Sequence, residues 1–229
     1  MPPASLAELN ARLVACERCP RLRAYCRAVA VEKRRAYRDQ EYWGRPVPGQ
    51  GDPAARVLLV GLAPSAHGAN RTGRMFTGDP SADFLTAALY RTGFANQPTS
   101  VHKDDGLRLR DLYMVAAAHC APPDNRPTAA ELANCQPYLA EHLARLPNVR
   151  VLLALGKIGF EALLTALAAA GLRPADPRPA FGHGLSYPVG RYTLLGSYHP
   201  SPQNTNRGRL TPAMLDAVLA QARALAELG

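Results

Sequence analysis

The chain has 229 residues and a formal net charge of +9 at neutral pH, and 24 of its 27 basic residues are arginine. No apolar run reaches the roughly 18 residues of a membrane span, and the N-terminus lacks the pattern of a signal peptide, so we expect a cytoplasmic protein. Because guanidinium groups bind phosphate in bidentate geometry, the charge favours an anionic partner such as nucleic acid. An arginine-rich surface without such a partner remains the alternative.

Residues 1–53 are expected to form a helical segment ahead of the main fold. Ser5 and Glu8 form a capping box that predicts a helix to about Ala15. A second, basic helix is expected over residues 21–35. Residues 37–53 are rich in glycine, proline and aromatic residues, which indicates an ordered loop.

Four strand–helix units follow. Short apolar runs predict strands at residues 56–60, 111–117, 149–155 and 192–196. Glycines at 93 and 171 lie where helix ends are expected, and a capping box joins Thr128 and Glu131. This alternation predicts an α/β fold, a three-layer α/β/α sandwich with a four-stranded, mainly parallel sheet, and residues 1–229 are interpreted as one domain. The helices are expected to begin near Ser81, Thr128, Lys157 and Thr211.

Polar loops follow two of these strands. Residues 61–79 are GLAPSAHGANRTGRMFTGD, and residues 199–208 are HPSPQNTNRG. Loops at the carboxyl ends of parallel strands form the ligand sites of open α/β sheets, so we expect both loops to contribute to one site. The glycines let the backbone approach a ligand closely, but they do not match a phosphate-binding P-loop.

With these two loops the chain resembles the uracil-DNA glycosylase superfamily, and the first loop is most similar to its family 5, with family 4 as the nearest relative. The resemblance runs from about residue 6 to residue 225. It implies a DNA repair enzyme that flips uracil, and also hypoxanthine or mismatched thymine, out of DNA and hydrolyses the N-glycosidic bond to leave an abasic site. The chain has only three lysines, none of them in these loops, so we expect no Schiff-base lyase step.

His199 and Asp79 are the expected catalytic residues. His199 matches the histidine that donates a hydrogen bond to the departing uracil anion in the similar families. Those families often place a polar residue after the first glycine of the first loop, where this chain has Leu62. Asp79 is the best substitute, as a group that orients water or stabilises the cationic sugar. The alternative is that Asp79 only caps the helix that follows it.

Base binding and DNA contact are assigned to further loop residues. Phe76 matches the aromatic residue that stacks on the flipped base. The Asn125 amide offers the donor and acceptor that the uracil edge requires, although a turn role is the alternative. The base-binding set also includes Gly61, Ala63 and His67. The predicted DNA contacts are Asn70, Arg71, Arg74, Gln203, Asn204 and Arg207.

Four of the five cysteines form pairs, Cys16 with Cys19 and Cys120 with Cys135. Spaced cysteines in a cytosolic protein more often bind metal than form disulfides, and the spacing allows either zinc or a [4Fe–4S] cluster. The resemblance implies the cluster, on all four of these cysteines. Cys26 is expected to be a buried, small apolar residue.

Alternatives of two classes stay open. One is a uracil-strict glycosylase similar to family 4, against which Leu62 argues. The other is an iron–sulfur or zinc protein that binds nucleic acid without catalysis. An inactive relative is expected to lose His199 or Phe76, and the chain keeps both. We expect single- or double-stranded DNA as the partner, and a monomer.

Overall fold

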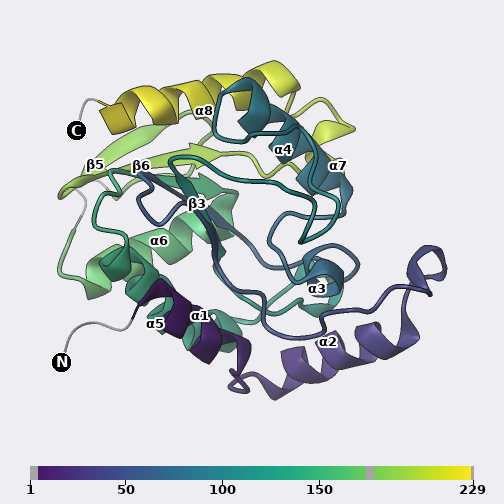
Figure 1. The fold of residues 1–229 in the computed structure, drawn as a ribbon. Coiled ribbons are helices and arrows are strands. Elements are labelled where there is room, and N and C mark those ends of the chain that lie inside the picture. The colour runs from purple at the N-terminus through teal and green to yellow at the C-terminus, as the bar shows by residue number, and fades with distance from the viewer. Residues whose placement is uncertain (1–4, 174–177, 228–229) are drawn as a thin grey trace.

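A six-stranded sheet flanked by helices forms the centre of the protein (Figure 1). The computed structural model describes residues 5–173 and 178–227. The strand order is β1-β3-β2-β4-β6-β5; β3, β2, β4 and β6 run parallel, and the two edge strands are antiparallel. The strands are β1 (Gln50–Gly51), β2 (Val57–Gly61), β3 (Leu112–Ala116), β4 (Val151–Leu155), β5 (Ser186–Val189) and β6 (Tyr192–Ser197).

The expected α/β class and mainly parallel sheet are confirmed, but the count of four strands is wrong. The four predicted strands are the central ones, and the sequence analysis missed both edges. β1 has only two residues and lies inside the predicted loop. β5 has four residues, one of them Pro188. Because an edge strand has hydrogen-bond partners on one side only, it tolerates proline and short length.

Helices cover both faces of the sheet, as Figure 1 shows. α5 and α6 pack on one face, and α4 and α8 pack on the other. α1 lies against α5, and α2 continues along the same side. The helices are α1 (Leu6–Val14), α2 (Pro20–Glu32), α3 (Ala69–Thr72), α4 (Pro80–Arg91), α5 (Ala129–Arg145), α6 (Lys157–Ala169), α7 (Pro202–Thr205) and α8 (Pro212–Glu227), with 3₁₀ turns η1 (Arg35–Tyr37) and η2 (Pro123–Asn125).

The central strands are buried on both sides, which explains why they are continuous apolar runs rather than alternating ones. Gly159 lets α6 approach β2 closely, since a Cβ there would lie 2.7 Å from the Val60 carbonyl oxygen. Phe160 beside it is fully buried in the core. The helix face is therefore held tightly against the strand that leads into the first polar loop.

The predicted helix ends are also confirmed. Capping boxes form at Ser5 and at Thr128, and Gly93 and Gly171 adopt the left-handed conformation just after α4 and α6. Among the residues that the structure describes, no helix has the length and hydrophobicity needed to cross a membrane. The first four residues, on which the expectation of no signal peptide partly rests, lie outside the described part of the chain.

Candidate active site and cysteine chamber

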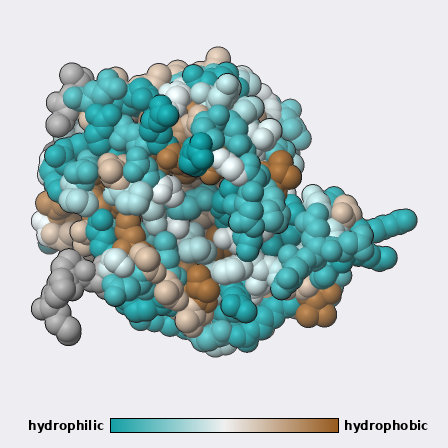
Figure 2. Space-filling model, in the orientation of Figure 1, coloured by the Kyte–Doolittle hydropathy of each residue, from teal (hydrophilic) through white to brown (hydrophobic). Residues whose placement is uncertain are grey.

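A pocket of about 630 Å³ lies at the carboxyl ends of the parallel strands. This volume is within the range of small-molecule sites. Both predicted loops contribute to it, and so does the turn after β3. Most of the surface in the view of Figure 2 is hydrophilic, with less polar residues visible in a central hollow. The predicted site residues that line the pocket are Gly61, Ala63, Phe76, Asp79, Asn125, His199, Gln203 and Asn204.

Phe76 forms an aromatic wall of the pocket. Its ring lies over Gly61, where an added Cβ would be 2.9 Å from the ring. The backbone of Phe76 is left-handed, with φ of 45°, which costs energy for a non-glycine residue. Gly61 is therefore needed for close approach, and Phe76 must be held in place by its surroundings.

His199 lies beside Phe76 in the pocket lining, with ring centroids 6.0 Å apart and an interplanar angle of 33°. Burial lowers the pKa of His199 to about 4, and the negative charge of Asp79 opposes part of this shift. The imidazole is therefore neutral at pH 7 and can donate one N–H. The side-chain amide of Asn204 donates to the His199 carbonyl oxygen at 2.8 Å, so Asn204 holds the loop that carries His199.

Asp79 is both a pocket residue and a helix cap. One carboxylate oxygen accepts the Ala82 backbone N–H at 2.9 Å at the start of α4. The other accepts the hydroxyl of Ser65. Gly68 packs against this pair, because a Cβ there would lie 2.1 Å from the carboxylate. The capping role is confirmed, and the catalytic role stays a prediction.

Asn125 lies in the turn η2 and is exposed on the pocket wall. Asp124 and Asn125 are both left-handed, with φ of 53° and 55°. Such consecutive strained residues are rare outside tight turns and functional loops. His67, by contrast, is not among the pocket-lining residues. Its ring nitrogen lies 3.1 Å from the Tyr42 hydroxyl, so the predicted base contact is not supported by this arrangement.

Three of the predicted DNA contacts, Asn70, Arg71 and Arg74, are buried instead. Arg71 bonds the carbonyl oxygens of His67 and Gly78 and stacks on Tyr37. Arg74 forms a salt bridge with Asp105, described below. These side chains shape the loop from inside, because their donors are directed at protein atoms. Their burial contradicts the expectation that they contact DNA.

The other predicted contacts lie nearer the surface. Gln203 is exposed at the pocket edge, and Arg207 is exposed just beyond α7. Ser65, which bonds Asp79, was not singled out from the sequence. Its position within the first polar loop was the available signal. Ser201 and Arg126 also line the pocket.

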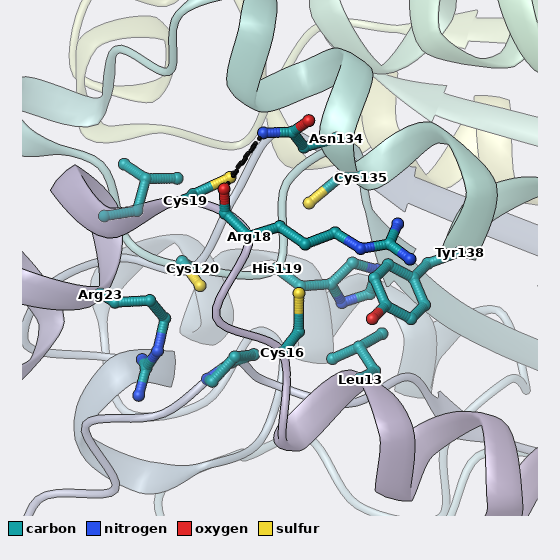
Figure 3. Close-up of a pocket in the computed structure, with 12 residues that line it drawn as sticks. Leu13, Cys16, Arg18, Cys19, Arg23, His119, Cys120, Asn134, Cys135 and Tyr138 are labelled. Carbon is teal, nitrogen blue, oxygen red and sulfur yellow. Dashed lines mark hydrogen bonds between the residues drawn. The ribbon is translucent and has the colours of Figure 1, made fainter.

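The four predicted metal-binding cysteines line a second, enclosed chamber (Figure 3). Cys16 follows α1, Cys19 precedes α2, Cys120 follows β3 and Cys135 lies in α5. All are free thiols, and their sulfurs face a common space in Figure 3. The side-chain amide of Asn134 donates to the Cys19 sulfur at 3.5 Å. Residues more than 100 positions apart in the sequence thus meet here.

The donor set of the chamber is four cysteine thiols, which suits either a single zinc ion or a [4Fe–4S] cluster. Within residues 5–173 and 178–227, no group of three or more cysteine, histidine or acidic side chains is arranged as a metal-ion site. Burial raises the pKa of Cys135 to about 11, so this thiol needs a bound cation to ionise at neutral pH. Cys26 is fully buried, as predicted.

The chain is similar in sequence to known proteins. The family model of the uracil DNA glycosylase superfamily matches residues 48–223. A type-5 uracil-DNA glycosylase of Mycobacterium tuberculosis is 50% identical over 224 residues, covering 97% of this chain and 82% of that protein. One of Thermus thermophilus is 52% identical over 219 residues, covering 94% and 96%. A type-4 uracil-DNA glycosylase of Pyrobaculum aerophilum is 30% identical over 162 residues, covering 70% and 74%.

Proposed function

The chain belongs to the uracil-DNA glycosylase superfamily, and from this premise we propose that it is a monofunctional DNA glycosylase of type 5. It flips uracil out of DNA and hydrolyses the N-glycosidic bond, which leaves an abasic site. Hypoxanthine and mismatched thymine are proposed as further substrates. The observation that carries the proposal is the meeting of Phe76, His199 and Asp79 in one pocket at the carboxyl end of the sheet.

The pocket offers each group that the reaction needs. Bond cleavage leaves negative charge on uracil and positive charge on the sugar. The neutral imidazole of His199 donates to the uracil oxygen that gains charge, and it costs little to bury because it is uncharged. Phe76 provides a flat surface for the base. Asn125 pairs with the base edge.

The role of Asp79 is to stabilise the sugar cation or to orient the attacking water. Its carboxylate is held by Ser65 and by the start of α4, so its position is fixed before substrate arrives. Leu62 lines the same pocket and carries no polar group. Of the two carboxylates that line the pocket, Asp124 is exposed in η2, whereas Asp79 is held by Ser65 and by the start of α4, so Asp79 is proposed for this task. None of the described residues that line the pocket is a lysine, so the product is an intact abasic site rather than a cleaved strand.

The four cysteines of the chamber are proposed to hold a [4Fe–4S] cluster. Such a group takes four thiolate ligands, which matches the four cysteines that line the chamber. When bound, it supplies iron–thiolate bonds that join α1, α2 and α5 to the end of β3. Arg21 supports the same junction through a bidentate salt bridge to Glu131, with nitrogen–oxygen distances of 2.8 and 2.7 Å.

DNA is the proposed partner, with Gln203 and Arg207 as contacts at the pocket edge. A single domain over residues 1–229, a monomeric state and a cytoplasmic location stay predictions. The formal net charge of +9 supports binding to a polyanion.

A base-excision assay tests the proposal. Purified protein is incubated with duplexes that carry uracil, hypoxanthine or thymine opposite each base, and alkali then reveals abasic sites. We expect cleavage after alkali with the uracil duplexes, and about 10²–10³-fold slower excision for His199→Ala. Iron-loaded protein that binds DNA and excises no base would instead support the non-catalytic alternative.

A further inference from the structure

Arg74 is buried behind the pocket and forms hydrogen bonds with four partners. Its guanidinium donates to Asp105 at 2.7 Å, Ser100 at 3.0 Å, Thr77 at 2.8 Å and the Lys103 carbonyl oxygen at 3.1 Å. The side chains of Arg74 and Asp105 are only 9% and 14% exposed. A largely buried charge pair of this kind is costly unless its remaining groups are also bonded, and here Arg74 and Asp105 each have further hydrogen-bond partners.

These hydrogen bonds connect the Arg74 guanidinium to the backbone on either side of Phe76. A guanidinium can only donate, so the hydroxyls of Thr77 and Ser100 accept from Arg74 and must send their own protons elsewhere. Ser100 donates to the Phe76 carbonyl oxygen at 2.9 Å. Thr77 lies 2.8 Å from the Ser100 hydroxyl and 3.1 Å from the Met75 carbonyl oxygen. The chain of donors thus ends on the peptide groups that flank Phe76.

The loop between α4 and β3, which carries Ser100 and Asp105, is also bonded directly to the backbone after Phe76. We call the bonds between this loop, Arg74 and the Phe76 turn the clamp. The Gly78 backbone N–H donates to the Ser100 carbonyl oxygen at 2.8 Å. Asp105 accepts backbone N–H groups from Val101 at 2.8 Å and Leu107 at 3.0 Å, which links the two halves of the loop. The strained turn at Phe76 is therefore bonded on both sides to a loop that Arg74 and Asp105 anchor.

We propose that Arg74 and Asp105 are positioning residues that hold Phe76 in its left-handed conformation, with the ring in the pocket, ready to receive a flipped base. Left-handed backbone at a phenylalanine persists only where its surroundings impose it. Without the clamp the turn relaxes and the ring leaves its place over Gly61. The inference rests on the proposed function, because Phe76 matters only if the pocket binds a base.

A double-mutant cycle between Arg74 and Phe76 tests this. In single-turnover excision of uracil, Arg74→Met is expected to lose on the order of 10-fold to 100-fold, the factor by which left-handed backbone is disfavoured when nothing holds it. In a Phe76→Ala background, the same change should lose less than about two-fold, since there is no ring to position. If Arg74→Met slows excision by the same factor in wild type and in Phe76→Ala, the inference is overturned.

Two further variants separate positioning from stability. Arg56→Met breaks a bidentate pair with Asp111 at the other end of the strands. The Arg56 side chain is 40% exposed, so the variant should lose only a little thermal stability and keep excision within about two-fold. Ser100→Ala removes the bond to Phe76 without leaving a buried charge unpaired, and it takes the place of Arg74→Met in the cycle if that variant does not fold. It should show the same non-additivity.

Amide hydrogen exchange gives a readout that does not depend on activity. In the free protein, exchange at Gly78 should be faster in Ser100→Ala and Arg74→Met than in wild type and Arg56→Met. Unchanged exchange would contradict the clamp. If wild-type protein excises no base, the proposed function is wrong, and the exchange data alone then decide whether this network holds the turn.

Discussion

The substitution Asp79→Asn separates helix capping from chemistry. One carboxylate oxygen caps α4 through Ala82 at 2.9 Å, and the other accepts the Ser65 hydroxyl. Asparagine can keep both contacts, because its oxygen still faces Ala82 and its amide can donate to the serine oxygen. The variant therefore removes the negative charge and little else.

The two roles predict effects of very different size. Asparagine caps helices about as well as aspartate, whereas alanine at an N-cap costs about 1 kcal/mol. For a chain of this length that lowers Tm by about 2–4 °C. With a total stability of about 5–15 kcal/mol, even Asp79→Ala stays more than about 99% folded at 25 °C. Lost stability therefore cannot slow the reaction measurably.

The assay is single-turnover excision of uracil, with thermal unfolding and iron content measured on the same samples. If the Asp79 charge supports the sugar cation or orients water, Asp79→Asn should be about 10²–10⁴-fold slower, with Tm nearly unchanged. Ser5→Ala is the matched control, because it removes the N-cap of α1 away from the pocket. It should lower Tm without changing the rate.

A near-wild-type rate for both Asp79→Asn and Asp79→Ala would refute the reasoning. The carboxylate would then be a helix cap alone, and His199 with the loop backbone would carry the catalysis.

The remaining predictions concern His199, the cysteines and DNA contact. Burial lowers the pKa of His199 to about 4, so the excision rate should show no ionisation of this group between about pH 6 and 8, where an ordinary histidine titrates. A step in the rate near pH 6.5 that His199→Ala abolishes would contradict the neutral imidazole. The same lowered pKa makes the free energy of unfolding depend on pH. The contribution of neutral His199 is complete above about pH 6.5 and is lost as the pH falls toward 4, because the unfolded chain takes up the proton first. Unfolding of wild type and His199→Ala, measured across this pH range, gives the size of this contribution. Purified protein should be brown with about four irons per chain. Cys135→Ala should lose iron and stability, whereas the control Cys26→Ala should keep its iron. One zinc per chain without iron would rule out the cluster. Arg207→Ala should reduce the slope of log affinity against log salt by about 0.9 if Arg207 contacts one phosphate, without changing which base is excised. The control is the exposed Arg110, which lies near the opposite end of β3. An equal change of slope at both positions would argue against a specific contact.

The sequence was sufficient to predict the parts of the structure that depend on local or periodic patterns. The four central strands are continuous apolar runs because both of their faces are buried. The helix starts at Ser5 and Thr128 follow from side-chain caps only three residues away. The two polar loops could be placed at one site because parallel strands end at one edge.

The edges of the sheet depended on tertiary structure. β1 and β5 have too few residues to show a pattern, and each exists because a longer neighbour offers free hydrogen-bonding groups. The chamber is similar in this respect. Their positions in the sequence grouped the four cysteines into two pairs. Only the tertiary packing of α1, α5 and the segment after β3 brings the two pairs together.

Burial of the loop arginines was likewise decided only by the tertiary structure. Arg74 and Arg207 both lie in polar, glycine-containing loops, yet one is buried and the other is exposed. The difference arises because Asp105, 31 residues from Arg74, folds back to pair with it. A contact over such a separation depends on how the loop between α4 and β3 packs, and the local residue pattern carries no record of that packing.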